Sequence, residues 1–192
     1  VLPTIGTTFT VEQVLARPIE ANTVLGHYTH FGNLLGLLGI AVPVGTTTQG
    51  YGEGRFVAFV SNAVGLAGST GARRQVFWRD NLTGETKLIS ASAAGVEGNG
   101  DSFAPAISAD GLTVAFESYA SNLVANDTNG VRDVFVWNAQ RPELGATRAS
   151  VNAAGAEANA ESYEPTLSGD GKVVAFSSGA SNLSTGVSGI NT

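Results

Sequence analysis

One pattern of alternating apolar and polar positions occurs twice in the second half of the chain. The segment 100–116, GDSFAPAISADGLTVAF, returns sixty positions later as AESYEPTLSGDGKVVAF at 160–176. Each copy leads through small and apolar residues to an Asp-Gly pair (Asp110-Gly111, Asp170-Gly171) and a Val-Ala-Phe run. This order predicts a strand, a tight turn and a second strand. Repetition at a spacing of tens of residues predicts a repeat architecture.

The Val-Ala-Phe run occurs three times, at 57–59, 114–116 and 174–176, which divides the repeats into units 54–110, 111–170 and a partial 171–192. Further strands are predicted in each complete unit, at 75–79 and 133–137, at 85–91 and 146–151, and at 103–108 and 163–168. Four short antiparallel strands per unit are typical of a β-propeller blade. We therefore expect a mainly β fold with about two and a quarter four-stranded, propeller-type blades.

The first fifty residues have a different pattern. Thr10 with Gln13 three residues later predicts a helix start, and apolar residues then recur near helical spacing through 19–38. The run 39–45 predicts a short buried strand. We expect a short α-helical segment within 1–50, followed by a Gly-rich junction and the repeats at 54–192.

Composition excludes several classes of function. The chain has ten scattered Lys and Arg and a net charge of -6, which argues against nucleic acid as a partner. It has no Cys, which excludes disulfides and thiolate chemistry. The most apolar run, 31–44, is about fourteen residues and is too short to span a bilayer. No basic leader precedes the first residues, although a mature form would have lost a signal peptide.

Four patterns in the repeats resemble a known family. They are Ser-Ala-Asp-Gly-(x)3-Ala-Phe at 108–116, Ala-Ser-Asn-Leu at 120–123 and 180–183, Asp-Thr-Asn-Gly-Val-Arg-Asp-Val-Phe-Val at 127–136, and Ala-Ala-Gly-x-Glu-x-Asn at 93–99 and 153–159. Residues 54–192 are similar to the TolB-like, PD40 type of WD40-like propeller repeat found in bacterial secreted and periplasmic proteins. The resemblance implies a propeller fold and a periplasmic or extracellular location, while propellers host binding, scaffolding and catalysis alike.

Residues 1–46 resemble a second family. The stretch around YTHFGNLLGLLGIAVPVG is similar to a segment of allophanate hydrolase, in the amidase-signature family, where such a helix leads into an Ala-Val-Pro strand. The Ser-Ser-Lys catalytic set of that family lies upstream of this segment, so no catalytic residue carries over. His27 and His30 are the only histidines, and without a third nearby ligand they predict an ordinary His pair.

One loop has the spacing of a calcium site. Asp127, Asn129 and Asp133 place side-chain oxygens at positions one, three and seven around Gly130, as short calcium loops do. The alternative is an Asx-rich turn between strands, because the equivalent loop 69–75 of the first unit has no acidic residue. Calcium is the one cofactor that the sequence suggests.

Other candidate sites have simpler interpretations. Ser102, in Gly-Asp-Ser, could be an esterase nucleophile, but it recurs as Ser162 and no His follows it. The acidic residues repeated at matched positions predict turn and inter-blade contacts rather than a glycosidase pair: Glu97 and Glu157, Asp101 and Glu161, Asp110 and Asp170. Trp78 and Trp137 fall one place out of register, and strand packing is favoured over an exposed ligand face.

Two function hypotheses follow. The leading one is a non-catalytic propeller-type binding or scaffold module for a protein or glycan partner. The alternative is a hydrolase of amidase or esterase type with a site that the sequence does not reveal. Because about two blades cannot close a ring, either the N-terminal segment caps one edge, or copies form a homo-oligomer through open blade edges, or the chain is part of a longer one. The last two are favoured.

Overall fold

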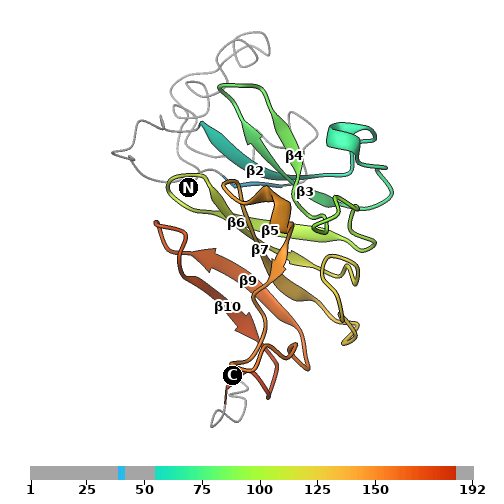
Figure 1. The fold of residues 1–192 in the computed structure, drawn as a ribbon, viewed down its shortest axis with the longest axis vertical. Coiled ribbons are helices and arrows are strands. Elements are labelled where there is room, and N and C mark those ends of the chain that lie inside the picture. The colour runs from blue at the N-terminus through green and yellow to red at the C-terminus, as the bar shows by residue number, and fades with distance from the viewer. Residues whose placement is uncertain (1–38, 42–54, 185–192) are drawn as a thin grey trace, which may run out of the picture.

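The computed structural model describes residues 39–41 and 55–184, and these form antiparallel β-sheets (Figure 1). Two short 3-10 turns, Leu66–Gly68 and Pro142–Leu144, are the helical elements of the described ranges, so the fold is mainly β as predicted. The expected α-helical segment lies outside the described residues. The strands are β1 (Gly39–Ala41), β2 (Phe56–Ser61), β3 (Gln75–Asp80), β4 (Thr86–Leu88), β5 (Ser102–Ile107), β6 (Thr113–Ser118), β7 (Asp133–Asn138), β8 (Thr147–Arg148), β9 (Ser162–Leu167) and β10 (Val174–Ser178).

The strands form three sheets in chain order, β1-β2-β3-β4, β5-β6-β7-β8 and β9-β10. The hairpin predicted over 100–116 is confirmed by antiparallel pairing of β5 with β6. Each sheet therefore begins one strand before the Val-Ala-Phe run from which the sequence units were counted. The first sheet takes its leading strand, β1, from the N-terminal fifty residues. By pairing with β2, this short strand from the N-terminal residues covers one edge of β2 at the start of the repeats.

The sheets stack face to face, and the core lies between the first two. In β2 and β3 one face carries Phe56, Ala58, Val60, Val76 and Trp78. It meets a face of the second sheet that carries Val114, Phe116, Phe135 and Trp137. Aligned on the repeat, these two sets occupy opposite faces of their sheets, as they must when successive blades stack in one direction.

The packing between the first two sheets explains why Trp78 and Trp137 are out of register in the repeat. Trp78 and Trp137 are each 4% exposed and their rings lie 5.6 Å apart between the two sheets. An offset of one residue reverses the face of a strand side chain, so the two indoles point toward each other rather than in the same direction. The packing interpretation is confirmed, and Trp78 Nε1 donates to the Gly111 carbonyl oxygen at 2.8 Å.

Pro105 and Pro165 occupy equivalent bulges on the leading strands β5 and β9. The register of β5 with β6 shifts between Phe103 and Ala106, and that of β9 with β10 shifts at the matching place. The residue before each proline has a positive φ, 49° at Ala104 and 55° at Glu164. A bulge tolerates proline because one residue there makes no ladder bond.

Candidate functional site

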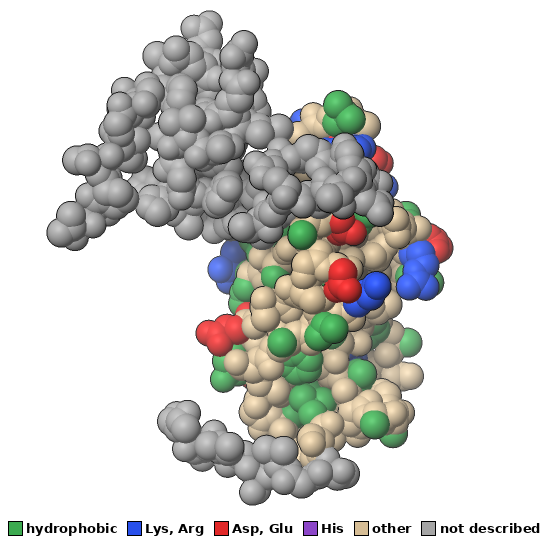
Figure 2. Space-filling view, turned by 90° about the vertical axis from the view of Figure 1, so that its left-hand side faces the viewer, with side chains coloured by type: hydrophobic (Ala, Val, Ile, Leu, Met, Phe, Trp, Pro, Cys, Tyr) green, Lys and Arg blue, Asp and Glu red, His purple; other side chains and the backbone are tan. Residues whose placement is uncertain are grey.

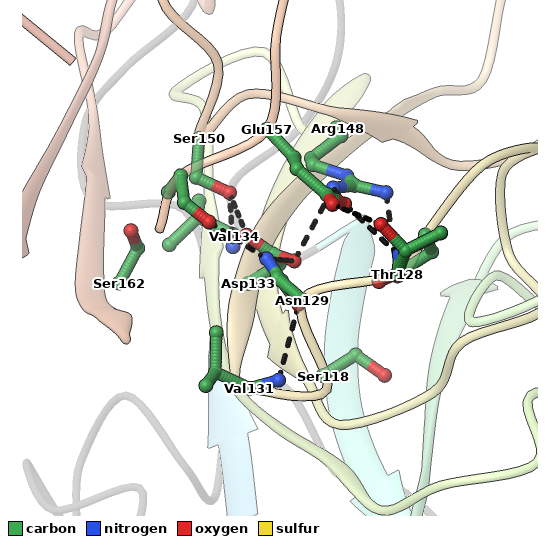
Figure 3. Close-up of polar contacts among 12 residues, drawn as sticks. Ser118, Thr128, Asn129, Val131, Asp133, Val134, Arg148, Ser150, Glu157 and Ser162 are labelled. Atoms are coloured by element: carbon green, nitrogen blue, oxygen red, sulfur yellow. Dashed lines mark hydrogen bonds and ion pairs between the residues drawn. The ribbon is translucent and has the colours of Figure 1, made fainter. Parts of the chain in front are cut away.

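A buried arginine lies at the centre of the loop predicted to bind calcium (Figure 3). Arg148, on β8, is 6% exposed at its side chain and contacts three carboxylates. Its Nη2 lies 3.4 Å from Asp127 Oδ2, and its Nη1 lies 3.6 Å from Asp133 Oδ2 and 2.6 Å from Glu157 Oε2. The structure thus brings Asp127 and Asp133 together, around a guanidinium supplied by a later strand.

Asn129 and Asp133 are bound to their own surroundings. Asn129 Nδ2 donates to Asp133 Oδ2 at 2.9 Å and to the Ala158 carbonyl oxygen at 3.0 Å, while its Oδ1 accepts the Val131 N–H. Ser150 donates its hydroxyl to Asp133 Oδ1. Both residues therefore help to fix the loop against the strands, whatever else the loop binds.

The electrostatics of this cluster differ between its acids. Burial raises the pKa of Asp127, with Arg148 opposing the rise and the charges of Asp133 and Glu157 adding to it. Hydrogen bonds from Thr128 and Arg148 lower the pKa of Glu157 to about 2. One guanidinium faces three carboxylates, so the charges of Asp133 and Glu157 add to the burial that raises the pKa of Asp127.

The first unit builds the same corner without ion pairs. Gln75 takes the place of Asp133, accepts the Ser90 hydroxyl and donates to the Gly98 carbonyl oxygen at 2.8 Å. Ser69 replaces Asp127 and donates to Glu97 at 2.7 Å, while Leu88 replaces Arg148. Blades of this type therefore fold with Glu97 as the one carboxylate of the corner, held by hydrogen bonds, and the ion-paired set is particular to the second unit.

Calcium at Asp127, Asn129 and Asp133 stays a prediction. Within 39–41 and 55–184, no group of three or more His, Cys, Asp or Glu side chains is placed to hold a metal ion. The Arg148 guanidinium pairs with both aspartates, so an incoming cation would have to compete with it. The spacing of acids could be read from the sequence, but the arginine could not, because its counterpart in the first unit is apolar.

A second recurrent contact joins successive sheets. Arg74 forms an ion pair with Asp101 at 2.9 Å and lies over the Phe103 ring. Its counterpart Arg132 pairs with Glu161 at 3.1 Å and lies 4.7 Å from the centre of the Tyr163 ring. Asp101 and Glu161, two of the acids predicted to make turn and inter-blade contacts, join neighbouring sheets here. In addition Arg132 pairs at 2.9 Å with Glu117, a carboxylate that also accepts the Glu164 N–H.

Ser102 lacks the surroundings of a nucleophile. It is fully buried and its hydroxyl pairs with the Ser118 hydroxyl at 2.9 Å, as Ser162 pairs with Ser178. Neither histidine lies in the described part of the chain, so no imidazole is seen near it there. A Ser-Ser pair that recurs between the same two strands of successive units is a strand contact, which agrees with the sequence interpretation.

The third unit has an open face. Ala58 and Ala115 are fully buried in the first two units, but the equivalent Ala175 is exposed. Thr113 is 6% exposed, whereas the equivalent Val173 is 61% exposed. Figure 2 shows uncharged and hydrophobic surface at the level where Figure 1 places β9 and β10. A face built to be covered by a following sheet is therefore available here.

The strand order and the stacking define a propeller-type repeat module. No helix in the described residues is both long and apolar enough to cross a membrane. No protein-family model and no curated protein matches the chain. Among solved structures, TolB from Acinetobacter baumannii is similar with a TM-score of 0.41 and 19% identity, over 74% of this chain and 26% of that chain. This chain thus spans about a quarter of the length of that protein.

Proposed function

We propose that this chain is a non-catalytic binding or scaffold module that engages a protein partner through the open face of its third unit. Val173, Ala175 and Ser177 form that face, and their counterparts in the first two units are buried under a neighbouring sheet. Burying such apolar surface is favourable, so a protein surface that covers this face would bind there. The small uncharged side chains suit a protein better than a glycan.

Without another partner, the same face would join copies of the chain. Open terminal units of repeat proteins expose the surface that elsewhere holds repeats together. A homo-oligomer through the open third unit is therefore part of the proposal. We also propose a periplasmic or extracellular location, which rests on the repeat resemblance.

Light scattering tests the proposal at several protein concentrations. We expect a mass above the 19.6 kDa of one chain and a return to that mass on Ala175→Arg, which places a charge on the open face. Leu82→Arg is the matched control, since Leu82 is 75% exposed in a turn of the first unit. A single-chain mass for all three proteins would count against self-association through this face.

The hydrolase alternative has its own test. A panel of chromogenic esters and amides should show no turnover by the purified protein, and Ser102→Ala should change nothing. Turnover that disappears in Ser102→Ala would overturn the non-catalytic assignment.

A further inference from the structure

In the part of the chain that the structure describes, the outer edge of β10 carries unpaired backbone groups. The Val173 carbonyl oxygen accepts the Ser168 N–H and the Gly179 N–H donates to the Glu161 carbonyl oxygen, each at 2.9 Å. Odd-numbered positions of β10 therefore face β9, and by alternation Val174, Phe176 and Ser178 present their N–H and C=O groups to the other edge. Among the described residues, no strand pairs with that edge.

The equivalent edges of the first two units are occupied, and each occupant places a Phe opposite a Phe. Phe59 of β2 pairs with Phe77 of β3, and their rings stack 5.5 Å apart. Phe116 of β6 pairs with Phe135 of β7, with rings 5.9 Å apart. Phe176 holds the same position in β10, and no ring of the described residues pairs with it across the edge.

We propose that the outer edge of β10 binds an extended strand of a partner polypeptide, running antiparallel, with a Phe side chain opposite Phe176. This proposal rests on the proposed binding function and specifies the chemistry of the partner. Strand addition to an open edge uses backbone hydrogen bonds for affinity and alternate side chains for specificity. β10 itself carries no charge and no proline, the usual devices that prevent such pairing.

The internal repeat also indicates the partner sequence. Opposite Ser61 and Ser118 lie the polar Gln75 and Asp133, and opposite Val114 lies Trp137. A fitting strand therefore begins with a polar residue, continues with Val-Phe, and ends with an aromatic residue opposite Val174. A second copy of β10, centred on Phe176, would instead place Val174 opposite Ser178 at both ends, which is a poorer match.

The probe is a fluorescent peptide with the sequence of residues 132–138, RDVFVWN, added to the intact chain. Anisotropy should show saturable binding, and the peptide RDVSVWN should bind at least about tenfold more weakly because it lacks the buried Phe. Val174→Pro should abolish binding, since it removes an outer-edge donor while β9 keeps its bonds. Val64→Thr, at a residue that is 82% exposed in the first unit and lies outside both the open face and the edge of β10, is the control.

Phe176→Ala gives an independent readout if Val174→Pro does not fold, as judged by circular dichroism. It should weaken RDVFVWN at least about tenfold and should change the binding of RDVSVWN far less. Equal binding of both peptides, or binding that survives Val174→Pro in a folded protein, would overturn the proposal. Absence of peptide binding, together with an oligomer that Val174→Pro disperses, would assign the edge to a second copy and overturn it as well.

Two outcomes distinguish failure of the strand proposal from failure of the proposed binding function of the open face. If no peptide binds but Ala175→Arg disperses an oligomer, the strand proposal is wrong and the open face remains a binding surface. If the peptide binds and Ala175→Arg has no effect on mass, the edge is the site and the face is not.

Discussion

At the scale of single residues, Arg148 holds together a corner that the first unit builds without an ion pair. Removing one partner from a buried ion pair leaves an uncompensated charge, which costs about 3–5 kcal/mol. We expect this loss for Arg148→Leu, measured as the free energy of unfolding in urea. The triple variant Asp127→Ser, Asp133→Gln, Arg148→Leu imports the set of the first unit and should recover most of the loss. A triple variant as unstable as the single one would show that the two corners are not equivalent.

Asp127 should oppose folding when it is ionised. Its pKa is raised in the folded state, so the folded protein binds the proton more tightly than the unfolded chain. The penalty is present above the raised pKa and disappears as the pH falls below the ordinary value of 3.8. Asp127→Asn should therefore raise the melting temperature at neutral pH, by up to about 2–4 °C for about 1 kcal/mol, and should have no effect near pH 3.

The same variant tests the calcium prediction. If the loop binds calcium, the ion should raise the melting temperature of the wild type and Asp127→Asn should lose most of that rise. Equal melting temperatures in millimolar calcium and in chelator would leave the loop as an Asx turn tied to Arg148. Asp127→Ser, which copies Ser69, serves as a second uncharged control.

Glu157 should behave in the opposite way. Its pKa falls from 4.5 to about 2 on folding, so its bonds stabilise the folded state above pH 4.5 and are lost as the pH falls toward 2. An acid titration followed by circular dichroism should show a steeper loss of stability over this window in the wild type than in Glu157→Gln. Identical slopes of stability against pH in the two proteins would show that ionised Glu157 does not stabilise the folded state.

At the scale of elements, the Asp-Gly turn of the β5-β6 hairpin is fixed against the first sheet. Gly111 has a φ of +73°, and a Cβ there would lie 2.5 Å from Phe56 side-chain atoms. Gly111→Ala should cost about 2–5 kcal/mol, because backbone strain and overpacking add. Gly130 has a φ of +66° with open space around it, so Gly130→Ala should cost only about 1–2 kcal/mol. Denaturant unfolding of the two variants separates the cost of backbone strain from the cost of overpacking against Phe56. Equal losses in the free energy of unfolding would show that contact with Phe56 contributes nothing.

The strands were predictable because their pattern repeats, but the sheet boundaries were not. A repeating sequence does not show at which residue a unit begins. The pairing of β5 with β6 shows where the second sheet begins. Burial of Trp78 and Trp137 could be inferred, yet their contact depends on which faces of the two sheets meet. The acids of the Asp127 loop were visible in the sequence, whereas Arg148 reaches them only because β8 lies beside β7.

At the scale of the whole molecule, stability should fall along the stack toward its open end. In repeat proteins each unit is stabilised by its neighbours, and the third unit lacks cover on one face and one edge in the described chain. Local opening of such a unit costs less free energy than opening of a central one. The fold itself supplies a matched comparison, because β6 and β10 share their sequence pattern and differ in their surroundings.

Hydrogen exchange at single-residue resolution measures this difference. The amides of Val174, Phe176 and Ser178 should exchange far faster than those of Val114, Phe116 and Ser118, which face β7. The amides of Ala175 and Ser177 face β9 and should lie between the two sets. If copies associate through the third unit, protection of the outer-edge amides should rise with protein concentration, because association follows mass action. Protection equal to that of β6 at every dilution would mean that the edge of β10 is already covered within one chain, and would contradict an open end.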